Sequence, residues 1–159
     1  MFSSSALRFA GELGEAKAKG LEGKTIRSAV TRGQGIFERY AVHQLEMIVS
    51  LMGTGIRRVM SVGPTEVAHL VLDFGEGRRA QLSMIQGLPY QLAVHGGGAS
   101  YLSNALKGDF FSGLIAAMLS FFKDPHANPV PKAETLEIIA AVDAGKKALA
   151  EPDVWISVD

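Results

Sequence analysis

The chain has 159 residues, which is the size of one ordinary domain and enough to bury a hydrophobic core. With 47% hydrophobic and 20% charged residues, its composition is that of a globular protein rather than a disordered one. Sixteen basic and sixteen acidic residues give a formal net charge of zero, and no lysine and arginine cluster forms a basic surface, so we expect no nucleic-acid partner. The absence of cysteine excludes disulfides, thiolate catalysis and cysteine-bound zinc.

No segment of the sequence resembles a membrane helix or a signal peptide. The longest apolar run, residues 113–122, is about half of the roughly 20 residues that a membrane-spanning helix needs, and it predicts a core helix instead. Residues 1–8 lack a charged region followed by an apolar one. We therefore expect a cytoplasmic protein with no membrane partner.

In chain order, the first elements are a short helix, a loop and a strand. Ser5 is placed to cap a helix over residues 6–10, which the glycines that follow are expected to end. Residues 15–23 are polar and contain glycine, which predicts a loop or a weak helical turn. Residues 24–31 alternate in the manner of a strand with one apolar face. That face is predicted to consist of Ile26, Ser28 and Val30.

The chain is organised around a long helix predicted over residues 37–52. Apolar side chains recur there at intervals of three and four, which is typical of a helix buried over most of its circumference. These side chains are Phe37, Ala41, Leu45, Ile48 and Met52. Gly53 is expected to end the helix.

A narrow polar stripe interrupts this helix. It consists of Arg39, His43, Glu46 and Ser50, each three or four positions from the next and therefore side by side. The stripe faces either water, as charged residues usually do, or a cleft. In a cleft, His43 would exchange a proton near neutral pH or polarise a substrate oxygen, and Glu46 or Arg39 would adjust its charge state.

The second half predicts a mostly antiparallel sheet. Strands are expected at residues 56–62, 90–95 and 154–158, and residues 65–74 and 79–85 form a hairpin around a glycine-containing turn. Several consecutive strands with short connections predict a sheet that is largely a meander.

Two further helices are expected, at residues 109–123 and 133–149. Asp109 caps the first of them, and an extended crossover containing Pro125, Pro129 and Pro131 joins the two. The fold class is therefore α+β, a single domain over residues 1–159 with three main helices on one face of an open sheet.

The other face of the sheet has no obvious cover. It bears either Leu70, Leu72, Leu82 and Met84, or Val71 and Ile85. An exposed apolar sheet face favours association with a second copy of the chain, so we expect a homo-oligomer formed through the sheet.

Three motifs in the sequence resemble those of other chemistries. The string His95-Gly-Gly-Gly98 is similar to the oxyanion loop of some lipases, but the chain has no Gly-x-Ser-x-Gly elbow, so these glycines predict a turn. The Gly-x-Gly pairs at residues 33–35 and 75–77 match neither a phosphate loop nor a dinucleotide fingerprint. The four histidines are widely separated, so we expect no metal site, and His69 is predicted to be a hydrogen-bonded strand residue.

Several short segments of this sequence, and their order along the chain, match those of a known family. They are Ser3-Ser-Ser-Ala-Leu-Arg8-Phe, His43-Gln-Leu-Glu46 followed by Leu51-Met-Gly53, the hairpin strands, Gly96-Gly-Gly98, and Glu134-Thr-Leu-Glu-Ile-Ile-Ala140. Together they resemble the C-terminal domain of the Gfo/Idh/MocA family of NAD(P)-dependent oxidoreductases, relatives of glucose-fructose oxidoreductase and inositol dehydrogenase. The resemblance covers nearly the whole chain.

This resemblance implies the substrate-binding and oligomerising half of an enzyme. In the family a Rossmann domain precedes this half and carries the glycine fingerprint and a catalytic lysine, neither of which occurs in this sequence. NAD or NADP is therefore implied for the full-length parent, whereas no cofactor and no hydride transfer are expected for this chain alone.

The resemblance also implies roles for the polar stripe. The family's catalytic histidine lies four residues after an aspartate; His43 matches the histidine, but Arg39 stands in place of the aspartate. An arginine there favours a neutral imidazole, or it holds a substrate carboxylate or phosphate. Glu46 matches an acidic residue of the family. His43 is thus the expected acid/base group, with Arg39, Tyr40 and Glu46 around a sugar-like or polyol substrate. The alternative is a non-catalytic module whose function is self-association through its sheet.

Overall fold

A computed structural model describes residues 3–64, 66–124, 126 and 128–159. The N-terminal elements are the 3-10 helix η1 (Ala6–Phe9), α1 (Gly11–Ala18), the 3-10 helix η2 (Gly23–Thr25), β1 (Ile26–Gly33) and α2 (Phe37–Met52). The sheet continues with β2 (Arg58–Ser61), β3 (His69–Gly75), β4 (Arg78–Met84), β5 (Gln91–Gly96) and β6 (Ala99–Ser103). The C-terminal elements are α3 (Phe110–Lys123), α4 (Lys132–Ala150) and β7 (Ile156–Ser157).

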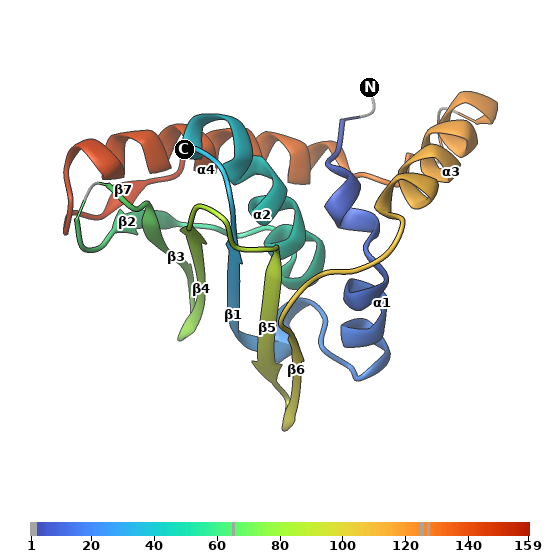
Figure 1. Ribbon diagram of the computed structural model, residues 1–159, viewed down its shortest axis with the longest axis horizontal. Coiled ribbons are helices and arrows are strands. Elements are labelled where there is room, and N and C mark those ends of the chain that lie inside the picture. Colours follow the sequence, from blue (N-terminus) through green and yellow to red (C-terminus); the bar gives the residue numbers. More distant parts are fainter. Residues whose placement is uncertain (1–2, 65, 125, 127) are drawn as a thin grey trace.

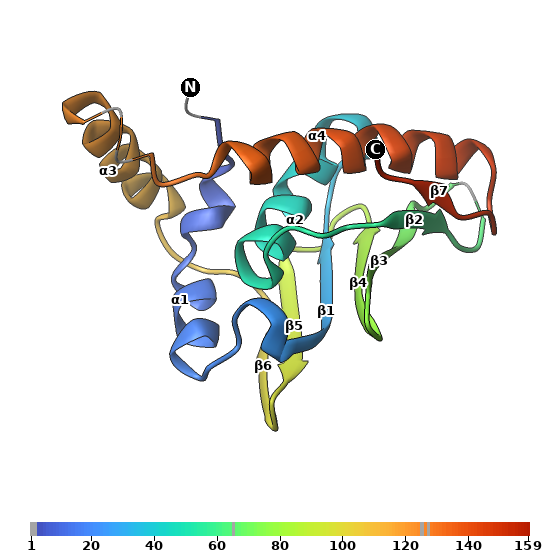
Figure 2. The same ribbon diagram turned by 180° about the vertical axis from the view of Figure 1, so that it is seen from behind.

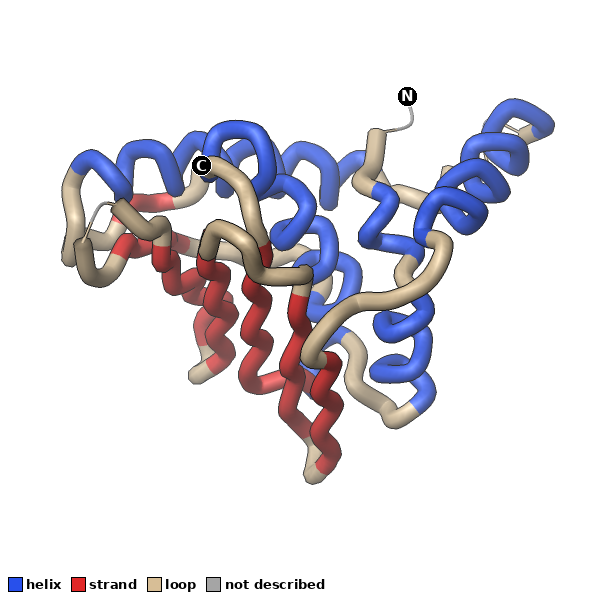
Figure 3. The backbone as a smooth tube through the Cα atoms, in the orientation of Figure 1, coloured by secondary structure: helices blue, strands red, loops and turns tan. Residues whose placement is uncertain are grey.

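The described strands form one open, seven-stranded sheet in the order β6-β5-β1-β4-β3-β2-β7. Its neighbouring strands are antiparallel except for β1 and β4, which are parallel. Figure 3 shows these strands gathered on one side of the helices. The predicted α+β class with a mostly antiparallel open sheet is confirmed.

The order of the strands differs from the predicted meander. β1 lies between β4 and β5, although β5 follows β4 in the chain. The connection between β4 and β5 therefore passes the end of β1, where Ile85 N donates a hydrogen bond to Gly33 O at 2.8 Å. Alternating side chains predict which face of a strand is buried, but they do not predict which strand lies beside it.

β1 also presents a different face from the predicted one. An irregularity between Ile26 and Ser28 shifts the pairing with β5. As a result Ile26, Ala29 and Thr31 are buried, whereas Ser28 and Val30 lie on the opposite face and are only partly buried. An extra residue in a strand turns all later side chains to the other face, and the residue pattern alone does not reveal it.

Helices α1, α2 and α4 lie on one face of the sheet (Figures 1 and 2). α2 is the centre of this layer: ten of its sixteen residues are buried, and they include all five of the predicted apolar positions. Gly53 ends the helix with a φ of +75°, as predicted. Leu70, Leu72, Leu82 and Met84 are buried under the helices, so the open face is the one that bears Val71.

α3 is not part of this helical layer. It projects beside η1 (Figures 1 and 2), and none of its residues is buried. The predicted cap is present, since Asp109 accepts hydrogen bonds from the N–H groups of Phe111 and Ser112. The prediction of a core helix at residues 113–122 is nevertheless wrong. An apolar run gives a helix one apolar side, but it does not decide whether another element covers that side.

Two further differences concern the helix α1 and the edge strand β6. α1 forms across both Gly11 and Gly14, where the sequence predicted a helix end and a loop. β6 was not predicted; it pairs with β5 through a tight turn in which Gly97 and Gly98 have positive φ. The predicted hairpin of β3 and β4 and the final helix are confirmed. Thr65, Pro125 and the first two residues, which the sequence placed in predicted segments, lie outside the described residues.

Candidate functional site

The polar stripe begins in the first turn of α2, where the chain has just left the end of β1. The connection contains Gly33 and Gly35, and two tyrosine rings lie directly on these glycines. A Cβ on Gly33 would overlap the ring of Tyr90, and a Cβ on Gly35, which has a φ of +102°, would overlap the ring of Tyr40. The first Gly-x-Gly pair therefore allows two rings to approach the backbone closely.

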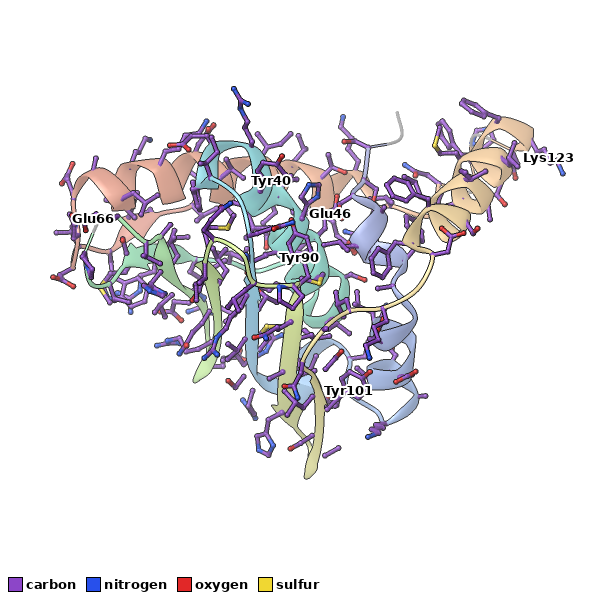
Figure 4. The ribbon with its side chains drawn as sticks, viewed as in Figure 1. Tyr40, Glu46, Glu66, Tyr90, Tyr101 and Lys123 are labelled. Atoms are coloured by element: carbon purple, nitrogen blue, oxygen red, sulfur yellow. The ribbon has the colours of Figure 1, made fainter. Side chains whose placement is uncertain are left out.

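His43 lies beside both tyrosines. Its ring centroid is 5.8 Å from that of Tyr40 and 6.0 Å from that of Tyr90, which it meets edge-on at 83°. Figure 4 shows Tyr40 and Tyr90 close to each other between α2 and the start of β5, whereas Tyr101 lies far away on β6. Aromatic neighbours at these distances restrict the rotation of the imidazole ring.

An open hollow of about 430 Å³ adjoins this cluster. It is lined by Gln34, Gly35, Ile36, Arg39, Tyr40 and Gln86. The structure thus brings Arg39 and Tyr40 into one wall, together with two amide side chains. His43 is one helical turn further along and does not line the hollow, although its ring contacts Tyr40, which does. The volume and the polar groups suit a small hydroxylated molecule.

The two nitrogens of His43 have different surroundings. Nδ1 is 2.7 Å from the hydroxyl oxygen of Ser5. Nε2 has no hydrogen-bond partner among the described residues, and it is not one of their fully buried unpaired atoms. It is therefore accessible to solvent. Burial lowers the pKa of His43 from its ordinary value of 6.5, so the imidazole is neutral at pH 7. The predicted neutral form is thus produced by burial rather than by Arg39.

Glu46 lies deeper than His43 and does not line the hollow. Its side chain is 4% exposed and forms an ion pair with Arg8 of η1, and Arg8 also binds Glu134 of α4. Glu46 accepts a further hydrogen bond from the backbone N–H of Ser5 at 3.3 Å. Burial raises the pKa of Glu46, and the Arg8 guanidinium opposes that shift. The carboxylate therefore fixes the N-terminal segment to α2, and the structure shows no contact between it and the hollow.

Sequence reasoning missed part of this arrangement. Ser5 caps η1 as predicted, since it accepts a hydrogen bond from Leu7 N, but its contact with His43 was not foreseen. Arg8 lay within one of the strings that carried the resemblance, and a single arginine among apolar residues is a signal for a buried ion pair. No local pattern marks Tyr90, because only the position of β5 beside β1 brings it near α2.

The other histidines and the Gly-x-Gly pairs have structural surroundings among the described residues. Among the described residues, no three His, Asp or Glu side chains are close enough to hold a metal ion. His69 is hydrogen-bonded to Ser83 in the sheet, as predicted. Tyrosine rings occupy the space at the first Gly-x-Gly pair, and the side chain of Arg57 occupies it at Gly75. At each of these two pairs a side chain therefore covers the backbone of at least one glycine. No helix among them has the length and apolar character needed to cross a bilayer.

Solved structures share this fold. The chain superposes with a TM-score of 0.75 on a myo-inositol 2-dehydrogenase from Lactobacillus plantarum, at 10% identity, covering 100% of this chain and 65% of that one. The chain shares the fold of one part of an inositol dehydrogenase. A myo-inositol dehydrogenase from Corynebacterium glutamicum gives a TM-score of 0.74 at 11% identity, covering 97% and 63% of the two chains.

An oxidoreductase from Agrobacterium radiobacter, solved with NAD+, L-tartaric acid and magnesium, gives a TM-score of 0.66 at 12% identity, covering 96% and 63%. The chain thus spans less than two thirds of each of these proteins. No protein-family model and no curated protein matches the sequence. The shared fold confirms the architecture that the resemblance implied.

Proposed function

We propose that this chain is the substrate-facing part of an NAD(P)-dependent oxidoreductase that acts on a sugar-like or polyol substrate. The observation that carries the proposal is His43, a neutral imidazole with an open Nε2, held beside two tyrosines and next to a polar hollow. The fold shared with myo-inositol dehydrogenases supports the substrate class. In this proposal a dinucleotide-binding domain of the parent protein holds the cofactor.

Each group at the site has a separate role in this proposal. Arg39 and the amides of Gln34 and Gln86 supply hydrogen bonds to substrate hydroxyl groups around the hollow. The exposed ring of Tyr40 offers an apolar face to the C–H surface of a sugar ring. His43 exchanges a proton with a substrate oxygen at Nε2, the nitrogen that is open to solvent. This chain alone is therefore expected to bind substrate without oxidising it.

Binding is tested directly on this chain by NMR titration with myo-inositol and with glucose. We expect the largest amide shifts at the first turn of α2 and around Gln86, and we expect His43→Gln to reduce them. His95→Gln is the matched control, because His95 is exposed on the open face of the sheet and its Nδ1 is likewise bonded to a serine hydroxyl. Shifts that cluster elsewhere, or no shifts with either compound, would contradict the proposed site.

The acid/base role is tested by kinetics in a parent protein that contains the dinucleotide-binding domain. Loss of a general acid/base typically lowers turnover by about 10²–10⁴-fold, and we expect His43→Ala to fall in that range. The matched variant His95→Ala should leave kcat unchanged. Wild-type turnover across pH for His43→Ala would eliminate the acid/base role while leaving the binding site intact.

A second candidate function is self-association through the open face of the sheet. One observation favours it: an apolar row crosses the strands on that face, and its outermost residue, Leu102, is 67% exposed. The row consists of Leu102, Ala93, Val30, Val71 and Met60, with Gln81 between the two valines. A self-complementary apolar row of this kind suits a two-fold interface with a second copy.

Light scattering tests this association. We expect the wild-type chain to have at least the mass of a dimer, and Val30→Glu to have the mass of a monomer, because the variant places a charge in the middle of the row. Lys146→Glu on α4 is the control for an added acidic charge outside the sheet. A monomeric wild-type chain at high concentration would contradict self-association.

A further inference from the structure

We propose that Ser5 is a positioning residue for His43: its hydroxyl donates a hydrogen bond to Nδ1 and fixes the neutral tautomer that carries its proton on Nε2. The chemical meaning of this tautomer rests on the function proposed above, whereas the hydrogen bond does not. The two side chains come from segments far apart in sequence, because Ser5 precedes η1 and His43 lies within α2.

The direction of the hydrogen bond follows from the donors around Ser5. The backbone N–H of Leu7 donates to Ser5 Oγ at 3.2 Å, so the oxygen already accepts one hydrogen bond. The hydroxyl proton needs an acceptor, and His43 Nδ1, at 2.7 Å, is its only hydrogen-bond partner of that kind among the described residues. Ser5 is 6% exposed, so water has little access to satisfy the proton instead.

The opposite arrangement leaves a buried donor unsatisfied. If Nδ1 carried the proton, Ser5 Oγ would accept from both Nδ1 and Leu7 N, and its own proton would point to no acceptor. A neutral imidazole has one protonated nitrogen, so a hydrogen bond donated to Nδ1 places the proton on Nε2. Nε2 is the nitrogen that has no hydrogen-bond partner among the described residues and is not fully buried.

Ser5 is itself held in place by the buried ion pairs. Its backbone N–H donates to Glu46 Oε1 at 3.3 Å, and Glu46 is bound to Arg8, which in turn binds Glu134. The segment before η1 thus contacts α2 at two positions one turn apart, at His43 and at Glu46. The group that orients the imidazole therefore comes from the N-terminal segment rather than from the preceding turn of α2, where Arg39 is exposed.

This tautomer defines what the resting site can receive. A protonated Nε2 donates a hydrogen bond, so the fitting ligand atom is an oxygen that accepts one, such as a carbonyl or hydroxyl oxygen of the substrate. Before Nε2 could accept a proton, the proton would have to move to Nδ1 and the Ser5 hydroxyl would have to rotate from donor to acceptor. In its resting state His43 is therefore a hydrogen-bond donor to a substrate oxygen.

The test is a long-range ¹H–¹⁵N NMR correlation of the ring nitrogens in this chain, labelled on its four histidines and recorded near pH 7.5. We expect His43 to show the Nε2-protonated pattern, with the Nδ1 resonance displaced by its hydrogen bond. Ser5→Ala should move the Nδ1 resonance to the value of a free unprotonated nitrogen, and Ser5→Thr should retain the wild-type position. Ser100→Ala is the matched control, which should move only the ring of His95.

Two results would overturn the proposal. An Nδ1-protonated pattern for His43 in the wild-type chain would reverse the direction of the hydrogen bond, and this spectrum decides the point even if Ser5→Ala does not fold. An Nδ1 resonance that is the same in folded Ser5→Ala as in the wild type would show that Ser5 does not contact the ring. The measurement uses no substrate, so its failure and a failure of the sugar titration are distinguishable.

Discussion

Arg8→Met is the substitution that tests most directly what holds the site together. Arg8 and Glu46 have side chains only 7% and 4% exposed, and the second partner of Arg8, Glu134, is 19% exposed. Methionine keeps most of the volume of arginine but leaves two carboxylates without a counter-charge. Removing one partner of a buried ion pair typically destabilises a protein by about 3–5 kcal/mol.

One feature of Arg8 reduces this loss. Its Nη2 is buried and has no hydrogen-bond partner among the described residues. An unsatisfied buried donor destabilises the native protein by about 1–3 kcal/mol, and methionine removes this donor. The net loss of unfolding free energy for Arg8→Met is therefore expected to be about 2 kcal/mol. Urea denaturation followed by circular dichroism measures it.

The loss should also depend on pH. Burial raises the pKa of Glu46 above 4.5, and Arg8 opposes that shift, so the pKa rises further in Arg8→Met. A carboxyl group with a raised folded-state pKa binds its proton more tightly in the folded state, so stability falls as pH rises above the unfolded value. Arg8→Met should therefore lose more stability at pH 8 than at pH 5. The double variant Arg8→Met/Glu46→Gln should lose less than Arg8→Met at pH 8.

Lys146→Met is the matched control for the loss of a basic side chain. Lys146 and Asp143 form an ion pair at 3.6 Å with side chains 48% and 63% exposed, and such exposed pairs contribute about 0–1 kcal/mol. If Arg8→Met were no more destabilising than Lys146→Met, or lost the same stability at pH 5 and pH 8, the buried ion pairs would not be what fixes η1 to α2.

Three further predictions concern single positions. Gly33→Ala should lower the unfolding free energy by about 1–3 kcal/mol, because its Cβ would overlap the Tyr90 ring. Gly14→Ala, with open space around the added Cβ in α1, should raise the unfolding free energy by about 0.5–1 kcal/mol. Urea denaturation of both variants gives the comparison, and equal effects would refute the prediction. Burial lowers the pKa of His43 below 6.5, so the unfolded chain binds the imidazole proton more tightly, and the wild type loses stability as pH falls below about 6.5. In thermal melts from pH 5 to pH 8, His43→Gln should flatten this part of the plot of stability against pH. An unchanged slope would count against the prediction. Phe122→Gln should change the unfolding free energy by less than about 0.5 kcal/mol, because Phe122 is 69% exposed. A loss of about 3 kcal/mol would mean that α3 is a core helix after all.

Local sequence patterns determined several elements of this protein. The spacing of the apolar residues predicted α2 and its buried side, and Gly53 predicted its end, because burial against a core imposes the helical period on the sequence. The β3–β4 hairpin followed from alternation around a glycine turn in the same way. The turn predicted for residues 96–98 is present at Gly97 and Gly98, whereas Gly96 belongs to β5 and the sequence did not predict β6.

Long-range packing determined what local patterns did not. The place of β1 between β4 and β5, and the shift after Ile26, depend on pairing with strands more than fifty residues away, which no window of sequence contains. α3 has an apolar side that the sequence shows clearly, yet its contact with η1 leaves that side only partly buried. Apolar residues indicate that a surface can be buried, and the arrangement of the other elements decides whether it is buried.

The polar stripe shows the same division at the site. The sequence by itself determined that Arg39, His43 and Glu46 lie along one side of α2, because a helix fixes the direction of each side chain about its axis. The tertiary structure decided how deep each one lies: Arg39 is exposed, His43 is half-buried and Glu46 is buried. The physical reason is that the N-terminal segment packs over the later turns of α2 but not over the first, so it pairs Glu46 with Arg8 and gives His43 the hydroxyl of Ser5.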